Sequence, residues 1–96
     1  MNGIPMGIQN AMELDFGIPI TGYLFDAVYS PPVIIGIVYC DSRGRFADGS
    51  AIHTSALRGA VSLMGYPVVQ TITGSVYVIV SWQAQGGSLH TRRTYH

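Results

Sequence analysis

Apolar residues fall in short runs of strand length, separated by polar stretches that contain Gly or Pro. Two of these runs, residues 33–40 and 76–82, are apolar at nearly every position, so each predicts a strand covered on both faces. Weaker runs of alternating or β-branched residues predict further strands at 18–25, 52–57 and 68–73. Residues 58–64 fit either a continued strand or a helical turn, and Gly65-Tyr66-Pro67 ends that segment.

These runs predict a mainly β fold of about five strands with little helix. Short connections between successive strands favour a small antiparallel meander. Without helices to cover a second face, the sheet should form a barrel or sandwich, or pack against another copy. We expect a single β domain at residues 18–82, an N-terminal extension at 1–17 with a helical turn or two near 9–14, and a polar C-terminal tail at 83–96.

Two hairpins are expected within this domain. Gly74-Ser75 lies between the last two strand-like runs, and a two-residue loop with Gly first is typical of a type II′ turn. The runs at 33–40 and 52–57 flank the polar stretch 41–50, which contains an Asp-Gly step and predicts a hairpin with a long loop. Binding groups concentrate on loops that a rigid scaffold holds, so this loop is the expected place for function.

Arg43, Arg45 and Phe46 make this loop chemically distinctive. An arginine fork binds phosphate or carboxylate through paired hydrogen bonds, and an exposed aromatic ring supplies an anchoring surface. The alternative is a loop in which Phe46 packs back onto the domain while Asp48 makes an Asx-type turn with the backbone near Ser50. The sequence leaves both alternatives open.

The composition bears on assembly and on partners. The 96-residue chain is 48% apolar and only 10% charged, and its formal net charge is zero. So few charges favour association, and we expect a homo-oligomer; the alternative is a monomer whose surface is Ser, Thr, Gly and Gln. Basic residues are too sparse for nucleic-acid binding, and no apolar run is long enough to span a membrane. A cytoplasmic location is therefore expected.

A catalytic cluster can be assembled from Cys40, Asp41, His53 and Ser55, if pairing of the flanking strands brings Cys40 near His53. No nucleophile motif accompanies these residues, and a His on a strand is more often a polar-face residue, so we do not expect an enzyme. No metal or cofactor is expected either, because no cofactor motif is present and the histidines are scattered: His53, His90 and His96.

One pattern in the chain resembles short uncharacterised proteins that phages, prophages and similar mobile elements carry. Its first part is Phe46-Ala47-Asp48-Gly49-Ser50-Ala51-Ile52-His53-Thr54-Ser55, and its second part is Thr73-Gly74-Ser75-Val76-Tyr77-Val78. The resemblance spans residues 34–82. It implies a small β module, in a setting where accessory proteins often act by binding a host component.

We therefore expect a small non-enzymatic binding module, an accessory protein of a mobile element that acts through contacts with a host protein. The alternative is an oligomeric binder of a small anionic or nucleotide-like ligand. The residues expected to contact the partner or ligand are Arg43, Arg45, Phe46, Asp48, His53 and Tyr77.

Overall fold

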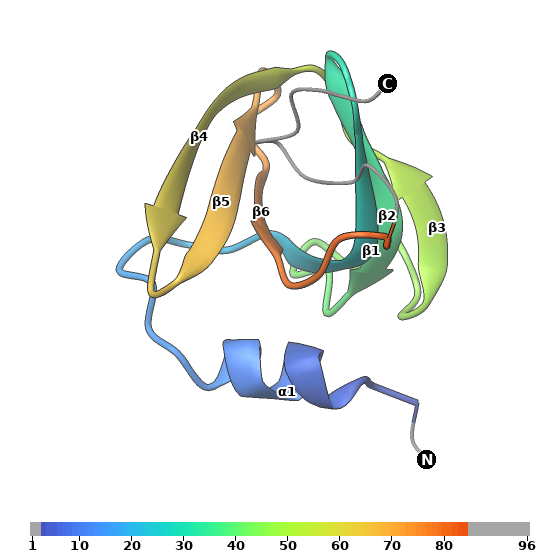
Figure 1. The fold of residues 1–96 in the computed structure, drawn as a ribbon, viewed down its shortest axis with the longest axis vertical. Coiled ribbons are helices and arrows are strands. Elements are labelled where there is room, and N and C mark those ends of the chain that lie inside the picture. The colour runs from blue at the N-terminus through green and yellow to red at the C-terminus, as the bar shows by residue number, and fades with distance from the viewer. Residues whose placement is uncertain (1–2, 85–96) are drawn as a thin grey trace.

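The computed structural model describes residues 3–84, which form one short helix and a six-stranded sheet (Figure 1). The mainly β fold predicted from the sequence is confirmed. The predicted C-terminal tail lies outside the described residues except for Gln83 and Ala84. In chain order the elements are α1 (Met6–Met12), β1 (Gly22–Ser30), β2 (Val33–Tyr39), β3 (Ser50–His53), β4 (Leu57–Leu63), β5 (Tyr66–Thr71) and β6 (Val76–Ile79).

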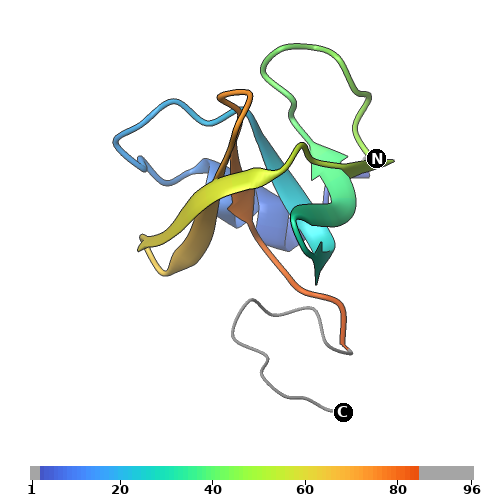
Figure 2. The ribbon, with the colours of Figure 1, turned by 90° about the horizontal axis from the view of Figure 1, so that it is seen from above.

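The sheet consists of two antiparallel three-stranded units joined at its centre. Its strand order is β3-β2-β1-β6-β5-β4, and the central pair, β1 with β6, is parallel. The meander prediction therefore holds within each unit, while the junction between them is not antiparallel. Figures 1 and 2 show that the sheet curls strongly, although it does not close into a barrel. β3 and β4 remain its two edges.

The connection between β3 and β4 crosses from one unit to the other and ties them together. The Thr54 N–H donates to the Ile34 carbonyl at 2.9 Å, and the Leu57 N–H donates to the Pro32 carbonyl at 2.7 Å. The Thr54 hydroxyl oxygen also accepts from the Ile34 N–H at 3.0 Å. Because Thr54 and Ile34 are both buried, the two bonds between them satisfy polar groups that water cannot reach.

A bulge bends β1 and extends it beyond the predicted strand. Phe25 pairs with Ile37 and Val28 pairs with Ile35, so one extra residue of β1 lies opposite Gly36. Asp26, in the bulge, has a φ of 53°, and its N–H donates to the Ser81 hydroxyl at 2.9 Å. Bulges increase local twist, which accounts for the curl of the sheet. Residues 26–30 therefore belong to β1, whereas the sequence indicated a connection there.

Both faces of the sheet bury apolar side chains. One face carries the larger cluster: Leu24, Ala27, Ile34, Val38, Ile52, Val69, Tyr77 and Ile79. The other face carries Val68 and Val78, and Phe16 from the segment before β1 packs over them. The predicted helical turn exists as α1, which begins three residues earlier than expected and buries Ile8 and Ala11 beneath the sheet (Figure 1).

The two strands that were expected to be covered on both faces differ in how far they are buried. β6 lies at the centre of the sheet, and Tyr77, Val78 and Ile79 are all buried, as predicted. In β2 only one face is fully buried, because the strand lies one position from the edge and Ile35 on the other face is 45% exposed. The prediction that both faces of β2 are covered was therefore wrong.

The hairpin turns also differ from their sequence assignments. Between β5 and β6, Thr71 pairs with Ser75 through the Thr71 N–H at 2.9 Å, so the loop has three residues, 72–74. Gly74, with a φ of 90°, is the last of them, which is the arrangement of a turn followed by a Gly bulge and not a type II′ turn. The two-residue turn is Met64-Gly65, where φ is 53° and 83°, the signs that a type I′ turn requires.

Candidate functional site

The loop between β2 and β3 is organised around the carboxylate of Asp41. One oxygen accepts the Arg43 N–H at 3.3 Å, and the other accepts the Arg45 N–H at 2.7 Å and the Phe46 N–H at 3.1 Å. The Asp41 side chain is 0% exposed. Burial by itself raises the pKa of this carboxyl, but the three backbone hydrogen bonds and the nearby Arg45 guanidinium hold the pKa below its ordinary value. Asp41 therefore fixes the backbone that carries both arginines.

Asp48 closes the base of the same loop. Its carboxylate accepts the Cys40 N–H at 2.7 Å, and the neighbouring Gly49 N–H donates to the Val38 carbonyl at 2.8 Å. Asp48 thus bonds the first loop residue, and not the backbone near Ser50 as one alternative had it. The Cys40 thiol is half-buried, and burial together with the charge of Asp48 raises its pKa. A thiol in this environment has little tendency to form the nucleophilic thiolate.

Both arginines reach from the loop to the β5–β6 turn and the start of β6. Arg43 donates from Nη1 to the Ser75 hydroxyl at 3.1 Å and from Nη2 to the Gly74 carbonyl at 3.5 Å. Arg45 donates from Nη2 to the Tyr77 hydroxyl at 3.2 Å. Figure 2 shows the loop, in green, at the same end of the molecule as the orange turn. The structure therefore brings together three of the residues predicted from sequence, Arg43, Arg45 and Tyr77.

Tyr77 contributes its hydroxyl group rather than its ring to this arrangement. The residue is only 3% exposed, and its ring belongs to the larger apolar cluster. Gly22 on β1 makes room for the ring: a Cβ atom at that position would lie 3.3 Å from a Tyr77 ring carbon. Tyr77 thus positions Arg45 from inside the sheet and offers no open surface of its own.

Phe46 packs back onto the domain, which decides between the two alternatives for this residue. Its ring is half-buried against the larger apolar cluster, and the Arg45 guanidinium lies 5.2 Å from the ring centroid. That geometry is a cation–π contact within the loop. Phe46 is a structural support for Arg45 and not a free anchoring side chain.

His53 lies apart from this loop. It is exposed on edge strand β3 and pairs with Ile35, whereas the loop leaves β2 after Tyr39. His53 and Cys40 therefore sit at opposite ends of the β2–β3 ladder, and the catalytic cluster considered from sequence is not assembled. A shallow cavity of about 270 Å³ lies beside His53 and is lined by Ile35, Ala51, Ile52 and His53.

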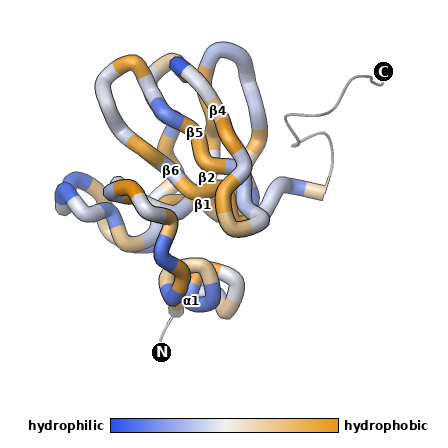
Figure 3. The backbone as a smooth tube through the Cα atoms, turned by 90° about the vertical axis from the view of Figure 1, so that its left-hand side faces the viewer, coloured by the Kyte–Doolittle hydropathy of each residue, from blue (hydrophilic) through white to orange (hydrophobic). Residues whose placement is uncertain are grey.

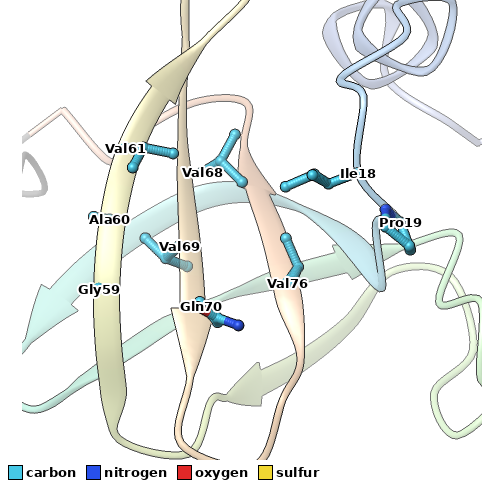
Figure 4. A pocket seen from close by; sticks show the side chains of 9 residues that line it. All are labelled: Ile18, Pro19, Gly59, Ala60, Val61, Val68, Val69, Gln70 and Val76. Carbon is cyan, nitrogen blue, oxygen red and sulfur yellow. The ribbon is translucent and has the colours of Figure 1, made fainter.

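An apolar groove on the other half of the sheet was not anticipated from the sequence. It has a volume of about 500 Å³ and lies between the Ile18-Pro19 segment and β4, with Val68 and Val76 between them (Figure 4). The sequence assigned Ile18 and Pro19 to a strand. In the structure these residues precede β1, are exposed, and form one wall of the groove. The alternating pattern of the segment gave no signal that it would cross the sheet instead of joining it.

Within residues 3–84, no three His, Cys, Asp or Glu side chains come together as a metal site. Over that range, too, no helix combines the length and apolarity needed to cross a membrane. His90, His96 and the tail arginines lie outside the described residues. Comparison of the chain with protein-family models, with curated proteins and with solved structures gives no match in any of the three.

Proposed function

We propose that this protein is a small non-enzymatic binding module that holds an acidic segment of a protein partner. The observation that carries the proposal is the pair of arginines on a hydrogen-bonded loop, with Arg43 held at the β5–β6 turn and Arg45 held at Tyr77 of β6. Rigid presentation lowers the entropy lost on binding, since neither the loop backbone nor the arginine side chains must first be ordered.

The charge balance of the loop supports an anionic partner. Asp41 is the acidic group nearest to Arg45, with 3.7 Å between Nε and Oδ2, and its oxygens already accept three backbone N–H groups. Asp48 is engaged by the Cys40 N–H. The Arg45 side chain remains 43% exposed, so its guanidinium can still reach an incoming carboxylate.

The turn that Arg43 contacts also carries an exposed apolar residue. Ile72, in the turn that Arg43 contacts, is 63% exposed. We call Arg43, Arg45 and Ile72 the loop–turn surface. A basic surface with an apolar neighbour fits a peptide in which acidic residues flank an apolar one, because charge pairing sets the orientation and apolar contact adds affinity.

The resemblance to mobile-element proteins suggests a context for the proposed activity. We propose an accessory protein that acts in the cytoplasm on a host protein, and that self-associates. Self-association is included because only 10% of the residues of the chain are charged. In addition, seven large apolar side chains within residues 3–84 are exposed: Met6, Met12, Ile18, Ile35, Val61, Met64 and Ile72.

A small anionic ligand is the second candidate for the same residues. Arg43 and Arg45 bond Ser75 and Tyr77, which are two residues apart in the chain. Ser75 directly precedes β6 and is paired with Thr71. Side chains two apart in an extended segment share one face, so the two guanidinium groups approach this segment from the same side. One phosphate or carboxylate group bridging both arginines would use this arrangement.

The test is a binding measurement with defined probes. Acidic dodecapeptides that carry a central Phe or Leu, their Lys-substituted counterparts, and ATP are titrated against the protein. We expect the acidic peptides to bind and the Lys peptides not to bind. The double variant Arg43→Gln with Arg45→Gln should weaken acidic-peptide binding by roughly 10-fold or more, since two charge-assisted contacts are lost.

The control removes an arginine that is not part of the surface. Arg58 on β4 is exposed, and Arg58→Gln lowers the net charge without touching the loop. It should bind acidic peptides as the parent does. Binding of ATP without binding of acidic peptides would replace the proposal by the small-ligand candidate. Equal weakening in Arg58→Gln would show that net charge, and not this surface, is responsible.

A further inference from the structure

Among residues 3–84, no strand pairs with the outer edge of β4, and this edge is almost uncharged. β4 is the last strand of the sheet, and residues 58–62 are exposed along it. Proteins usually block such edges with Lys, Pro or a central bulge. β4 has neither Lys nor Pro, its single charge is Arg58, and its register shift lies near its start, between Leu57 and Gly59. The remaining stretch from Gly59 to Leu63 is therefore a ready template for another strand.

The register of the β4–β5 pair shows which backbone groups face outward. Ser62 pairs with Pro67, which has no N–H to donate, so this is a non-hydrogen-bonded pair. The N–H and C=O of Ser62 must then point away from β5, to the open edge. The direction of the backbone N–H and C=O groups alternates from residue to residue along a strand, so those of Ala60 point outward as well.

Side chains on the groove face make the edge self-complementary. Val61, 57% exposed, stands between Gly59 and Leu63 on this face and lines the groove (Figure 4). A Cβ atom on Gly59 would meet nothing within 4 Å, so there is free space beside Val61. Figure 3 shows that hydrophobic residues occur along β4 and β5. On this face of β4, the exposed apolar side chain of Val61 therefore lies next to free space at Gly59.

We propose that β4 pairs antiparallel with β4 of a second copy, about a two-fold axis at Val61. Ala60 of each copy then exchanges backbone hydrogen bonds with Ser62 of the other. The two Val61 side chains face each other directly, and Leu63 of each copy covers the free space at Gly59 of the other. The inference rests on the self-association proposed above and names the surface that performs it.

The charges favour a second copy over a foreign strand. The chain has zero net charge, so two copies meet without long-range repulsion. In this register Arg58 of one copy lies at the opposite end of the paired strands from Arg58 of the other, so like charges do not meet. The contact uses the same residues on both sides, which closes the assembly as a dimer. The sheet becomes continuous across the two copies.

This dimer leaves the loop–turn surface open. That surface belongs to the β2–β3 loop and the β5–β6 turn, neither of which is on the outer edge of β4. Each dimer therefore presents two copies of it, and a partner with two acidic segments would gain affinity through the raised effective concentration.

Sedimentation equilibrium at micromolar protein tests the interface. The parent should have twice the mass of its 10.3 kDa chain. Ser62→Pro should give a monomer, because it removes the outward N–H and leaves the inner pairing with β5 intact. Val61→Lys should also give a monomer, since it places two like charges opposite each other. Met6→Lys adds the same charge on exposed α1 and should remain a dimer.

Cross-linking tests the register. Val61→Cys, in a background with Cys40→Ser, should form a disulfide between copies, because directly opposite Cβ atoms are about 4.5–5.5 Å apart. Ala60→Cys in the same background should not. Efficient cross-linking of Ala60→Cys with none at Val61→Cys would overturn the proposed axis.

The outcomes separate this inference from the proposals on which it builds. A monomeric parent would overturn self-association and the β4 interface together. A parent dimer that persists in both Ser62→Pro and Val61→Lys would overturn only the β4 interface. In either case the acidic-peptide titration still reports on the loop–turn surface, because a monomer binds one peptide with unchanged affinity. A mass that rises without limit with concentration would show open stacking of strands and would also overturn the closed dimer.

Discussion

Asp41 illustrates how one buried carboxylate sets the geometry of two exposed cations. Its oxygens accept the backbone N–H groups of Arg43, Arg45 and Phe46, so the chain turns tightly around it. Arg43 then reaches the β5–β6 turn, Arg45 reaches Tyr77 on β6, and Phe46 packs beneath Arg45. Replacing Phe46 would disturb this support as well as any binding, which is why the arginine pair is the better probe of function.

We expect Asp41→Asn to destabilise the protein by roughly 1.5–3 kcal/mol at pH 7, the usual range for hydrogen bonds to a charged group. The pKa of Asp41 is lower in the folded state than in the unfolded chain. Its stabilising effect is therefore present above the unfolded pKa of about 3.9 and is lost as the pH falls through the folded pKa. Denaturant unfolding of parent and variant should give a constant difference between about pH 5 and 7 that shrinks below pH 4.

Asp15→Asn is the matched control for this experiment. Asp15 is exposed and accepts a single N–H, that of Gly17, at 2.8 Å. Its replacement should change stability by no more than about 0.5 kcal/mol. An Asp41→Asn deficit that stays the same down to pH 2 would contradict the role assigned to the charged carboxylate.

The conformation of the turns that connect the strands depends on single residues. In the β5–β6 hairpin the Gly74 N–H donates to the Thr71 carbonyl at 3.0 Å, and the Ser75 N–H donates to the Thr71 hydroxyl at 3.1 Å. This geometry requires the φ of 90° at Gly74. The same turn receives Arg43, so its conformation supports both the hairpin and the loop–turn surface.

Gly74→Val should lower the free energy of unfolding by roughly 1–3 kcal/mol, because a β-branched residue strongly disfavours positive φ. Thermal unfolding gives the comparison. Ala51→Val is the control, since Ala51 is exposed on β3, away from β4, and has no positive φ. It should melt close to the parent. A Gly74→Val variant that melts with the parent would mean that the turn tolerates another conformation.

At the scale of the whole molecule, the proposed pairing of β4 edges would couple folding to protein concentration. A dimer that forms only from folded chains stabilises them by mass action, so the melting temperature should rise with protein concentration. We expect this rise for the parent and for Met6→Lys, and a constant melting temperature for Ser62→Pro. Differential scanning calorimetry across a hundred-fold concentration range measures it. A parent melting temperature independent of concentration would speak against the dimer.

The local patterns were sufficient to find most of the sheet. Continuous apolar runs gave β2 and β6, and the polar Gly-containing stretch between β2 and β3 gave the long loop with Arg43 and Arg45. Residues 58–64 were ambiguous because β4 is exposed on both faces near its centre, so burial imposes no period of two on its sequence. The chemical character of the loop could be predicted because the charge and aromaticity of its side chains do not depend on the fold.

Sequence by itself determined that the chain is mainly β, where the long loop falls and which side chains it carries, because strand periodicity and turn residues are local properties. Only the tertiary structure decided that β1 and β6 run parallel and that Arg45 meets Tyr77. It also decided that Phe46 turns inward and that β4 is left at an edge. These features depend on contacts between residues that are distant in the sequence, such as the bond from Asp26 to Ser81. A pattern confined to neighbouring residues does not specify which distant strands will meet.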